Sequence, residues 1–216
     1  MKKIKIIHIN LSSGFAGAER HMIDLINHQS KDYKTYLIKS KKNTFINYSI
    51  VEKNTKIYKI SNFFKRNFLK KIIQKINPDI VHTHLGDASR IMSKSWGNFK
   101  LVATCHMNYK KKHYNNHDGI ILLNKTQEEI VKEQFSNKIL RINLWPPSIK
   151  SKKKTKIYLL NKLNIKKKSY IFGSIGRFHY QKGFDLILKV FNKLQLKKCY
   201  LVIIDNGHTE YKKIYK

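Results

Sequence analysis

Short apolar runs alternate with segments of helical spacing along most of the chain. Each run is four to six residues long and rich in Ile, Val and Leu, which is typical of strands buried on both faces of a parallel sheet. The runs lie at residues 5–9, 35–38, 79–83, 100–105, 119–123 and 139–144.

The segments between these runs carry apolar residues three and four positions apart, as amphipathic helices do. One helix is expected to open near Ala18 and a second to span residues 63–76. A third is expected after Asn124, which can cap it, with Gln127 three residues further on. This alternation predicts an α/β fold, with a doubly wound Rossmann-like domain over residues 1–150.

The pattern breaks at Pro146 and Pro147, and the charged stretch 151–156 has no apolar periodicity, so it is the expected linker. The pattern then resumes with a short helix (157–163), a strand (170–175), a further helix and a strand (199–204). One face of that helix carries Phe184, Ile187, Val190, Phe191 and Leu194. Residues 151–216 are therefore expected to form part of a second Rossmann-like domain.

The formal net charge of +32 suggests a basic nucleic-acid-binding protein as one alternative. Only five of the 45 basic residues are arginines, however, and lysines occur in every segment. Phosphate and base recognition favour arginine forks, so we expect no specific nucleic acid as a partner. The charge does predict attraction to an anionic membrane surface.

Two cysteines in separate segments form no disulfide framework, and no stretch approaches 18 apolar residues. We therefore expect a cytoplasmic protein that can associate with the inner face of the cell membrane.

The turn after the first run contains Gly14 and Gly17 in the segment NLSSGFAGAER. Glycines here allow close backbone approach, and the following helix N-terminus could hold a phosphate. Packing alone is an equally good explanation. A nicotinamide dinucleotide is disfavoured because the second run ends in Lys39 and Ser40, where such enzymes place an acid.

Histidines follow two of the central runs. His82 and His84 share a face at one strand end, but no cysteine or carboxylate cluster stands near them in sequence, so no metal site is predicted. Cys105 and His106 point to opposite faces, which excludes a dyad between them. Cys105 is expected in the core. His106 is the functional candidate at the mouth of the sheet, with a structural histidine as the alternative.

The segment GRFHYQKG places Arg177 at a strand end and Lys182 just before Gly183 and a helix. A guanidinium, an ammonium and helix-terminal N–H groups can then point into one space. These donors would stabilise a departing diphosphate. A solvated pair of surface cations is the alternative.

Four segments, at residues 14–20, 78–86, 102–108 and 175–194, resemble the GT-B glycosyltransferases of family 4 (glycosyl transferases group 1). The resemblance implies a retaining, metal-independent enzyme that takes a nucleotide-diphosphate sugar as donor and needs no cofactor. It also implies two Rossmann-like domains face to face, the acceptor on the N-terminal side and the donor on the C-terminal side. Together with the basic pair Arg177 and Lys182, His106 and the basic surface, it leads to the hypothesis that the acceptor is a cell-envelope glycan or a lipid-linked, lipopolysaccharide-type molecule.

By position, the resemblance assigns catalytic roles to His106, Arg177 and Lys182. It assigns donor-phosphate contacts to Gly14, Gly17, Arg177, Lys182, Asn206 and Gly207, and the acceptor-side cleft to His84. Two turns depart from the family pattern: residues 205–208 replace a glycine–acid–glycine–proline turn, and residues 145–149 replace an asparagine–glycine turn.

The later glutamate pair of the family, which holds the donor's ribose and sugar, has no counterpart in this sequence. An expected alternative is therefore a catalytically incomplete fragment of a split or decaying glycosyltransferase gene, truncated in its donor domain. A separate chain would then supply the missing half of that domain.

Overall fold

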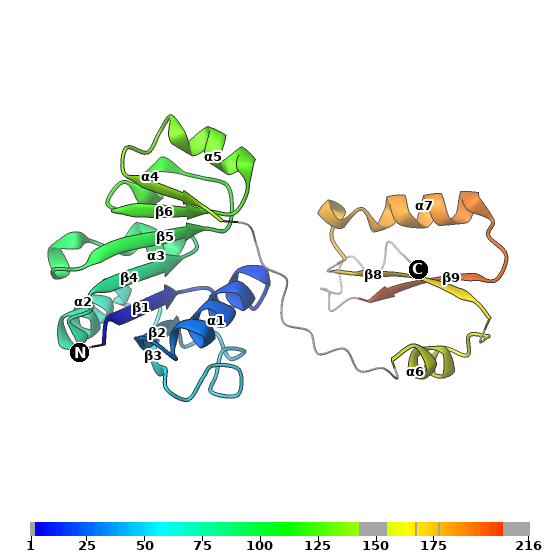
Figure 1. Cartoon of the computed structure of the whole chain (residues 1–216), viewed down its shortest axis with the longest axis horizontal. Coiled ribbons are helices and arrows are strands. Elements are labelled where there is room, and N and C mark those ends of the chain that lie inside the picture. The colour runs from blue at the N-terminus through cyan, green and yellow to red at the C-terminus, as the bar shows by residue number, and fades with distance from the viewer. Residues whose placement is uncertain (1–2, 143–154, 167, 177, 205–216) are drawn as a thin grey trace. The chain divides into compact units, whose positions relative to one another are not determined.

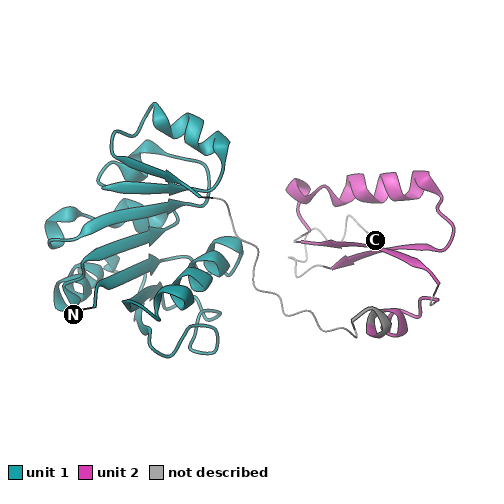
Figure 2. Ribbon diagram, viewed as in Figure 1, with its two compact units in different colours: residues 1–148 teal, residues 149–216 magenta. Residues whose placement is uncertain are grey.

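The computed structural model describes residues 3–142, 155–166, 168–176 and 178–204. The chain forms two compact units, residues 1–148 and 149–216, and each is described by itself (Figure 2). The prediction of an α/β fold, with a Rossmann-like first domain and part of a second, is confirmed.

A seven-stranded sheet forms the centre of the first unit, with the strand order β3-β2-β1-β4-β5-β6-β7 (Figure 1). All neighbouring strands are parallel. The strands are β1 (Lys5–Asn10), β2 (Lys34–Ser40), β3 (Lys56–Ile60), β4 (Ile80–His84), β5 (Lys100–Cys105), β6 (Gly119–Leu122) and β7 (Lys138–Arg141). The chain winds outward from β1 to β3 and then outward again from β4, so the direction of winding switches between β1 and β4. In such sheets ligands bind beyond the carboxyl ends of the strands at this switch.

Helices cover both faces of the sheet. Helix α1 (Gly17–Gln29) packs Met22, Ile23 and Ile26 against Leu37 on one face. The opposite face carries α2 (Lys65–Ile76), α3 (Gly86–Ile91), α4 (Lys111–Tyr114) and α5 (Lys125–Lys132). Figure 1 shows α1 in front of the sheet, with α2 and α3 behind it. In β1 and β2, buried Ile and Leu residues lie on both faces, as the apolar runs predicted. In β4 and β5, the buried Val81 and Leu101 pack in the cluster of α2 and α3, whereas Ile80 and Val102 on the opposite face are only partly buried.

One strand and two α-helices of this unit were missed by the sequence analysis: β3, α3 and α4. Strand β3 lies at the edge of the sheet, and of its five residues only Ile60 is fully buried. An edge strand needs few apolar residues, and α3 and α4 are too short to show a helical period. The predicted cap of α5 is confirmed, since the backbone N–H of Gln127 donates to Asn124 Oδ1 over 2.8 Å.

The second unit contains a parallel pair, β8 (Tyr170–Ile175) and β9 (Cys199–Ile204), with α6 (Thr155–Lys162) and α7 (Phe184–Leu194). The predicted linker 151–156 is wrong at its end, because α6 already begins at Thr155. The predicted apolar face of α7 is buried only at Phe184, whereas Val190 and Leu194 are 56% and 55% exposed. Two strands offer too little surface to cover a whole helix face. Each unit also contains one 3₁₀ turn: η1 (Lys94–Trp96) in the first unit and η2 (Tyr180–Lys182) in the second.

Among the helices that the structure describes, none combines the length and the apolar character needed to cross a bilayer.

Candidate functional site

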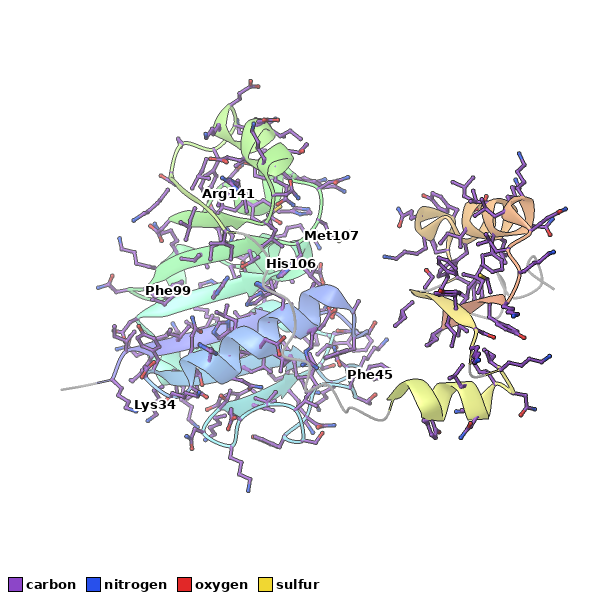
Figure 3. All side chains as sticks on the ribbon, turned by 45° about the vertical axis from the view of Figure 1, so that its right-hand side comes forward. Lys34, Phe45, Phe99, His106, Met107 and Arg141 are labelled. Carbon is purple, nitrogen blue, oxygen red and sulfur yellow. The ribbon has the colours of Figure 1, made fainter. Side chains whose placement is uncertain are left out.

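Histidines gather where the central strands of the first unit end. The parallel register sets His8 of β1 beside His82 of β4, and His84 lies two residues further along the same face. His106 follows the last residue of β5. Figure 3 shows His106 and Met107 at one end of the strands and Lys34 and Phe99 at the other. The histidines therefore lie at the carboxyl edge of the sheet, close to the switch between β1 and β4.

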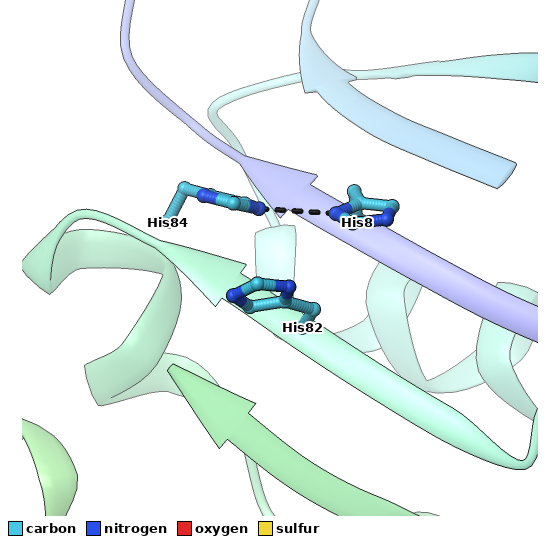
Figure 4. A group of neighbouring side chains, drawn as sticks. All are labelled: His8, His82 and His84. Atoms are coloured by element: carbon cyan, nitrogen blue, oxygen red, sulfur yellow. Dashed lines mark hydrogen bonds between the residues drawn. The ribbon is translucent and has the colours of Figure 1, made fainter. Parts of the chain in front are cut away.

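A chain of hydrogen bonds runs through three of these imidazoles to the surface. His8 Nε2 lies 2.8 Å from Gln29 Oε1, and His8 Nδ1 lies 3.1 Å from His84 Nε2 (Figure 4). His84 Nδ1 lies 3.2 Å from His106 Nε2. An amide oxygen can only accept, so the proton of His8 is on Nε2 and its Nδ1 accepts from His84 Nε2–H. His84 Nδ1 then accepts from His106 Nε2–H. This order leaves Nδ1 of His106 as a hydrogen-bond acceptor.

Burial holds these imidazoles neutral. Desolvation lowers the pKa of His8 to about 4, against a usual value of 6.5, although the hydrogen bond to Gln29 opposes the shift. Desolvation likewise lowers the pKa of His106 to about 4, with further lowering by His21. The pKa values of His82 and His84 are also well below the usual value, because both are buried and surrounded by other histidines. At neutral pH the site therefore presents uncharged donors and acceptors.

His8, His82 and His84 each offer a nitrogen within 4.8 Å of the others, which is the donor type of a zinc or copper site. The sequence analysis did not connect His8 with the other two, because 74 residues separate it from His82. Facing nitrogens of His8 and His84 are joined by a hydrogen bond, and His82 Nε2 bonds Thr104 Oγ1 over 2.8 Å. These contacts orient the imidazoles by themselves.

The glycine loop between β1 and α1 is tied down by a buried carboxylate. Glu19 Oε1 accepts from Ser12 Oγ over 2.6 Å, and Oε2 accepts from the backbone N–H of Ala16 over 2.8 Å. On the other side, Asn43 Nδ2 donates to the carbonyl of Gly14 over 2.7 Å. Lys39 Nζ, itself buried, donates to the carbonyl of Asn43. Sequence reasoning missed Glu19, Asn43 and Lys39 in this role.

Gly14 and Gly17 are not required by the backbone. Neither has a positive φ, and a Cβ built on either would meet no atom within 4 Å. The fold thus leaves open space at both positions, which fits the approach of a ligand better than close packing.

Gln127 fixes the turn that carries His106. Its Nε2 donates to the carbonyls of Cys105 and Met107 over 3.0 and 3.1 Å. Cys105 is fully buried, as expected, and burial raises the pKa of its thiol. His21 of α1 stands edge-on to His106, with ring centroids 5.2 Å apart. Gln127 was foreseen only as a helix-start residue, and His21 was not foreseen.

In the second unit, Lys182 is exposed and ends η2. Gly183 follows with a φ of 61°, a left-handed conformation that suits glycine, and α7 begins directly after it. The predicted proximity of Lys182 to a helix N-terminus is thus present. Arg177, Asn206 and Gly207 lie outside the described residues. A common site of Lys182 and His106 stays a prediction, since the two units are described separately.

The first unit is a doubly wound sheet with an open glycine loop after β1 and with imidazoles at the ends of β4 and β5. A second α/β unit follows it, in which a lysine stands just before a helix. These features define a GT-B type protein. The glycosyltransferase family 4 model matches residues 15–135, more than half of the chain, and the model for glycosyl transferases group 1 matches residues 156–216. The chain belongs to glycosyltransferase family 4. Among curated protein sequences, none matches it.

Solved structures share this fold at low identity. Anabaena Alr3699/HepE in complex with UDP and glucose is 14% identical with a TM-score of 0.76, and the match covers 98% of this chain. A glycosyltransferase from Rickettsia africae ESF-5 is 16% identical with a TM-score of 0.73 over 95% of this chain. The lipopolysaccharide outer core galactosyltransferase WaaB, in its apo form, is 18% identical with a TM-score of 0.60 over 97% of this chain. This chain spans 64%, 61% and 63% of their respective lengths.

Proposed function

We propose that this chain acts as a glycosyltransferase. It moves a sugar, with retention of configuration, from a nucleotide-diphosphate donor to a cell-envelope glycan or lipid-linked acceptor. The reaction would take place in the cytoplasm at the inner face of the membrane. The family membership supports sugar transfer. HepE, which was solved with UDP and glucose, supports a uridine nucleotide, and WaaB supports a lipopolysaccharide-type acceptor.

The observation that carries the proposal is the pairing of His84 with His106 at the switch of the sheet. A neutral His106 with an accepting Nδ1 can orient a sugar hydroxyl without adding charge. The open loop at Gly14 and Gly17 leaves room for donor phosphates beside the N-terminus of α1.

Lys182 and the first N–H groups of α7 would act on the leaving group. Breaking the sugar–phosphate bond leaves its electron pair on the diphosphate oxygen, and a cation with oriented N–H donors stabilises that charge. No metal or cofactor is invoked for this step.

The first experiment measures binding apart from chemistry. Thermal shifts of the full chain with UDP, UDP-glucose and, as a control, AMP should show stabilisation by the uridine nucleotides alone. Lys182→Ala should remove most of this shift, whereas Lys193→Ala on the exposed side of α7 should retain it.

The second experiment measures UDP release from UDP-glucose with a lipid-linked glycan acceptor, and the anomeric configuration of the product by NMR. His106→Ala should lower turnover by about 100-fold, the range for one positioned catalytic group. An inverted product would overturn the retaining mechanism. Nucleotide binding without any turnover would favour the incomplete-fragment alternative, and the absence of binding would overturn the proposal.

A further inference from the structure

Three phenylalanines stand in solvent around the start of α2. Phe63, Phe64 and Phe68 are 78%, 75% and 45% exposed, and the first two are among the most exposed large apolar residues described. Exposed Arg66, Lys70 and Lys71 lie between and behind them in the sequence. These six residues are called the α2 patch below. Single exposed apolar residues are common, but three phenylalanines within six positions call for an explanation.

The backbone at this point departs from what helix formation favours. Phe64 occupies the N-cap of α2 with a φ of 55° and a ψ of 29°, the left-handed region, and makes no side-chain cap bond. Bulky residues avoid this region, and helix starts favour Ser, Thr, Asp or Asn. Local stability therefore does not account for Phe64, and strain that the rest of the fold maintains points to a function.

The rest of α2 separates an apolar face from a basic one. Leu69, Ile73 and Ile76 are buried against the sheet. The exposed positions include Lys70, Lys71 and Lys75, and the helix contains no acidic residue. Lys65 is paired with Asp87 over 3.0 Å, and the guanidinium of Arg66 lies 5.6 Å from the centre of the Trp96 ring. These contacts anchor the start of α2 on the fold while its phenylalanines stay free of the core.

The start of the α2 patch, Phe63 and Phe64, lies at the edge of the sheet that carries the candidate site. Strand β3 ends at Ile60, and α2 begins at Lys65, so Phe63 and Phe64 follow the carboxyl end of a strand. Because all strands of the sheet are parallel, this is the same edge at which His84 and His106 lie.

We propose that the α2 patch binds the surface of an anionic lipid bilayer, with the phenylalanines in the headgroup region and the lysines against acidic headgroups. Phenylalanine with flanking Lys and Arg is the composition of segments that lie in a membrane interface, and the basic residues are complementary to acidic lipid. The inference rests on the proposed function in one respect: a bilayer at this edge would present a lipid-linked acceptor to the site.

Vesicle co-sedimentation of the full chain tests the inference without any sugar donor, so failed transfer and failed membrane binding remain distinguishable. The chain should bind vesicles of mixed phosphatidylcholine and phosphatidylglycerol and not vesicles of phosphatidylcholine alone. Phe63→Ser with Phe64→Ser should weaken binding about tenfold at unchanged net charge. The matched control, Phe45→Ser with Tyr158→Ser, removes aromatics that are 60% and 64% exposed elsewhere and should bind as the parent does.

A second pair of variants separates the patch from the general charge of the protein. Lys70→Gln with Lys71→Gln should weaken binding several-fold more than Lys197→Gln with Lys198→Gln, another adjacent pair of exposed lysines, in the second unit. Equal losses in both pairs, or full binding by the Phe63/Phe64 variant, would overturn the inference. If the Phe63/Phe64 variant bound vesicles as the parent does but transferred less sugar to a soluble acceptor, the inference would also be overturned. The phenylalanines would then be assigned to contact with the acceptor.

Discussion

Nδ1 of His84 lies 3.2 Å from Nε2 of His106, so a fully buried histidine at the end of β4 orients a partly exposed one after β5. His8 and Gln29 continue the contact inward to α1. Because each imidazole accepts on Nδ1 and donates from Nε2, the orientation of the Gln29 amide determines whether Nδ1 of His106, the nitrogen that does not face His84, accepts or donates a hydrogen bond.

Nitrogen NMR on labelled protein tests this order. His8, His84 and His106 should all carry their proton on Nε2 at pH 7.5. In His84→Ala, the ring of His106 loses its acceptor and should populate both tautomers, whereas His28→Ala, an exposed histidine of α1, should leave His106 unchanged. A proton on Nδ1 of His106 in the parent protein would contradict the assignment.

As the pH is lowered, the first unit should begin to lose stability at pH values well above those at which carboxylates titrate. His8 and His106 have folded-state pKa values of about 4, against 6.5 when unfolded. Between these values the unfolded chain binds more protons, so the free energy of unfolding falls as the pH falls, by roughly 1.4 kcal/mol per pH unit for each group. Above pH 6.5 this contribution is fully present.

Urea unfolding followed by circular dichroism between pH 7.5 and 5 measures the effect. The slope of the free energy of unfolding against pH gives the number of protons taken up on unfolding. His106→Ala should reduce this number by about one, and His28→Ala should not alter it. A stability that stays constant over this pH range would show that the imidazoles titrate normally in the folded state.

Gly86→Ala should destabilise the first unit because the start of α3 passes close to α4. A Cβ at Gly86 would overlap the ring of His113, with Cε1 only 2.8 Å away. The nearest atoms that the Cβ would meet all belong to the partly buried side chain of His113, which must turn aside, so the cost should lie near the lower end of the range of about 1–3 kcal/mol. Gly14→Ala is the control, since its Cβ would meet nothing within 4 Å and should change stability by less than about 0.5 kcal/mol.

Glu19→Ala should loosen the glycine loop. The change removes the acceptor for Ser12 Oγ and for the N–H of Ala16, and a lost cap of this kind costs about 1–2 kcal/mol. Hydrogen exchange at the amide of Ala16 should speed up accordingly. Glu129→Ala, which removes an exposed ion pair 3.9 Å long, should leave both stability and exchange nearly unchanged.

Apolar periodicity alone was enough to predict most strands and helices of this protein. Buried parallel strands must be apolar on both faces, so runs such as residues 100–105 stand out in the sequence. Edge strand β3 and the short helices α3 and α4 did not stand out, because edge positions and single turns impose weak patterns. The end of the linker was misplaced for a similar reason: Thr155 and Lys156 are polar, yet they form the first turn of α6.

The sequence by itself determined the class of fold, the place of His84 and His106 at strand ends, and the glycine loop. Only the tertiary structure decided that His8 joins His84, that Glu19 and Asn43 hold the loop, and that Gln127 fixes the turn at His106. The physical reason is that strand periodicity is local, whereas strand order is not. The order β1 beside β4 brings residues 76 positions apart into hydrogen-bond contact, and no local pattern records that pairing.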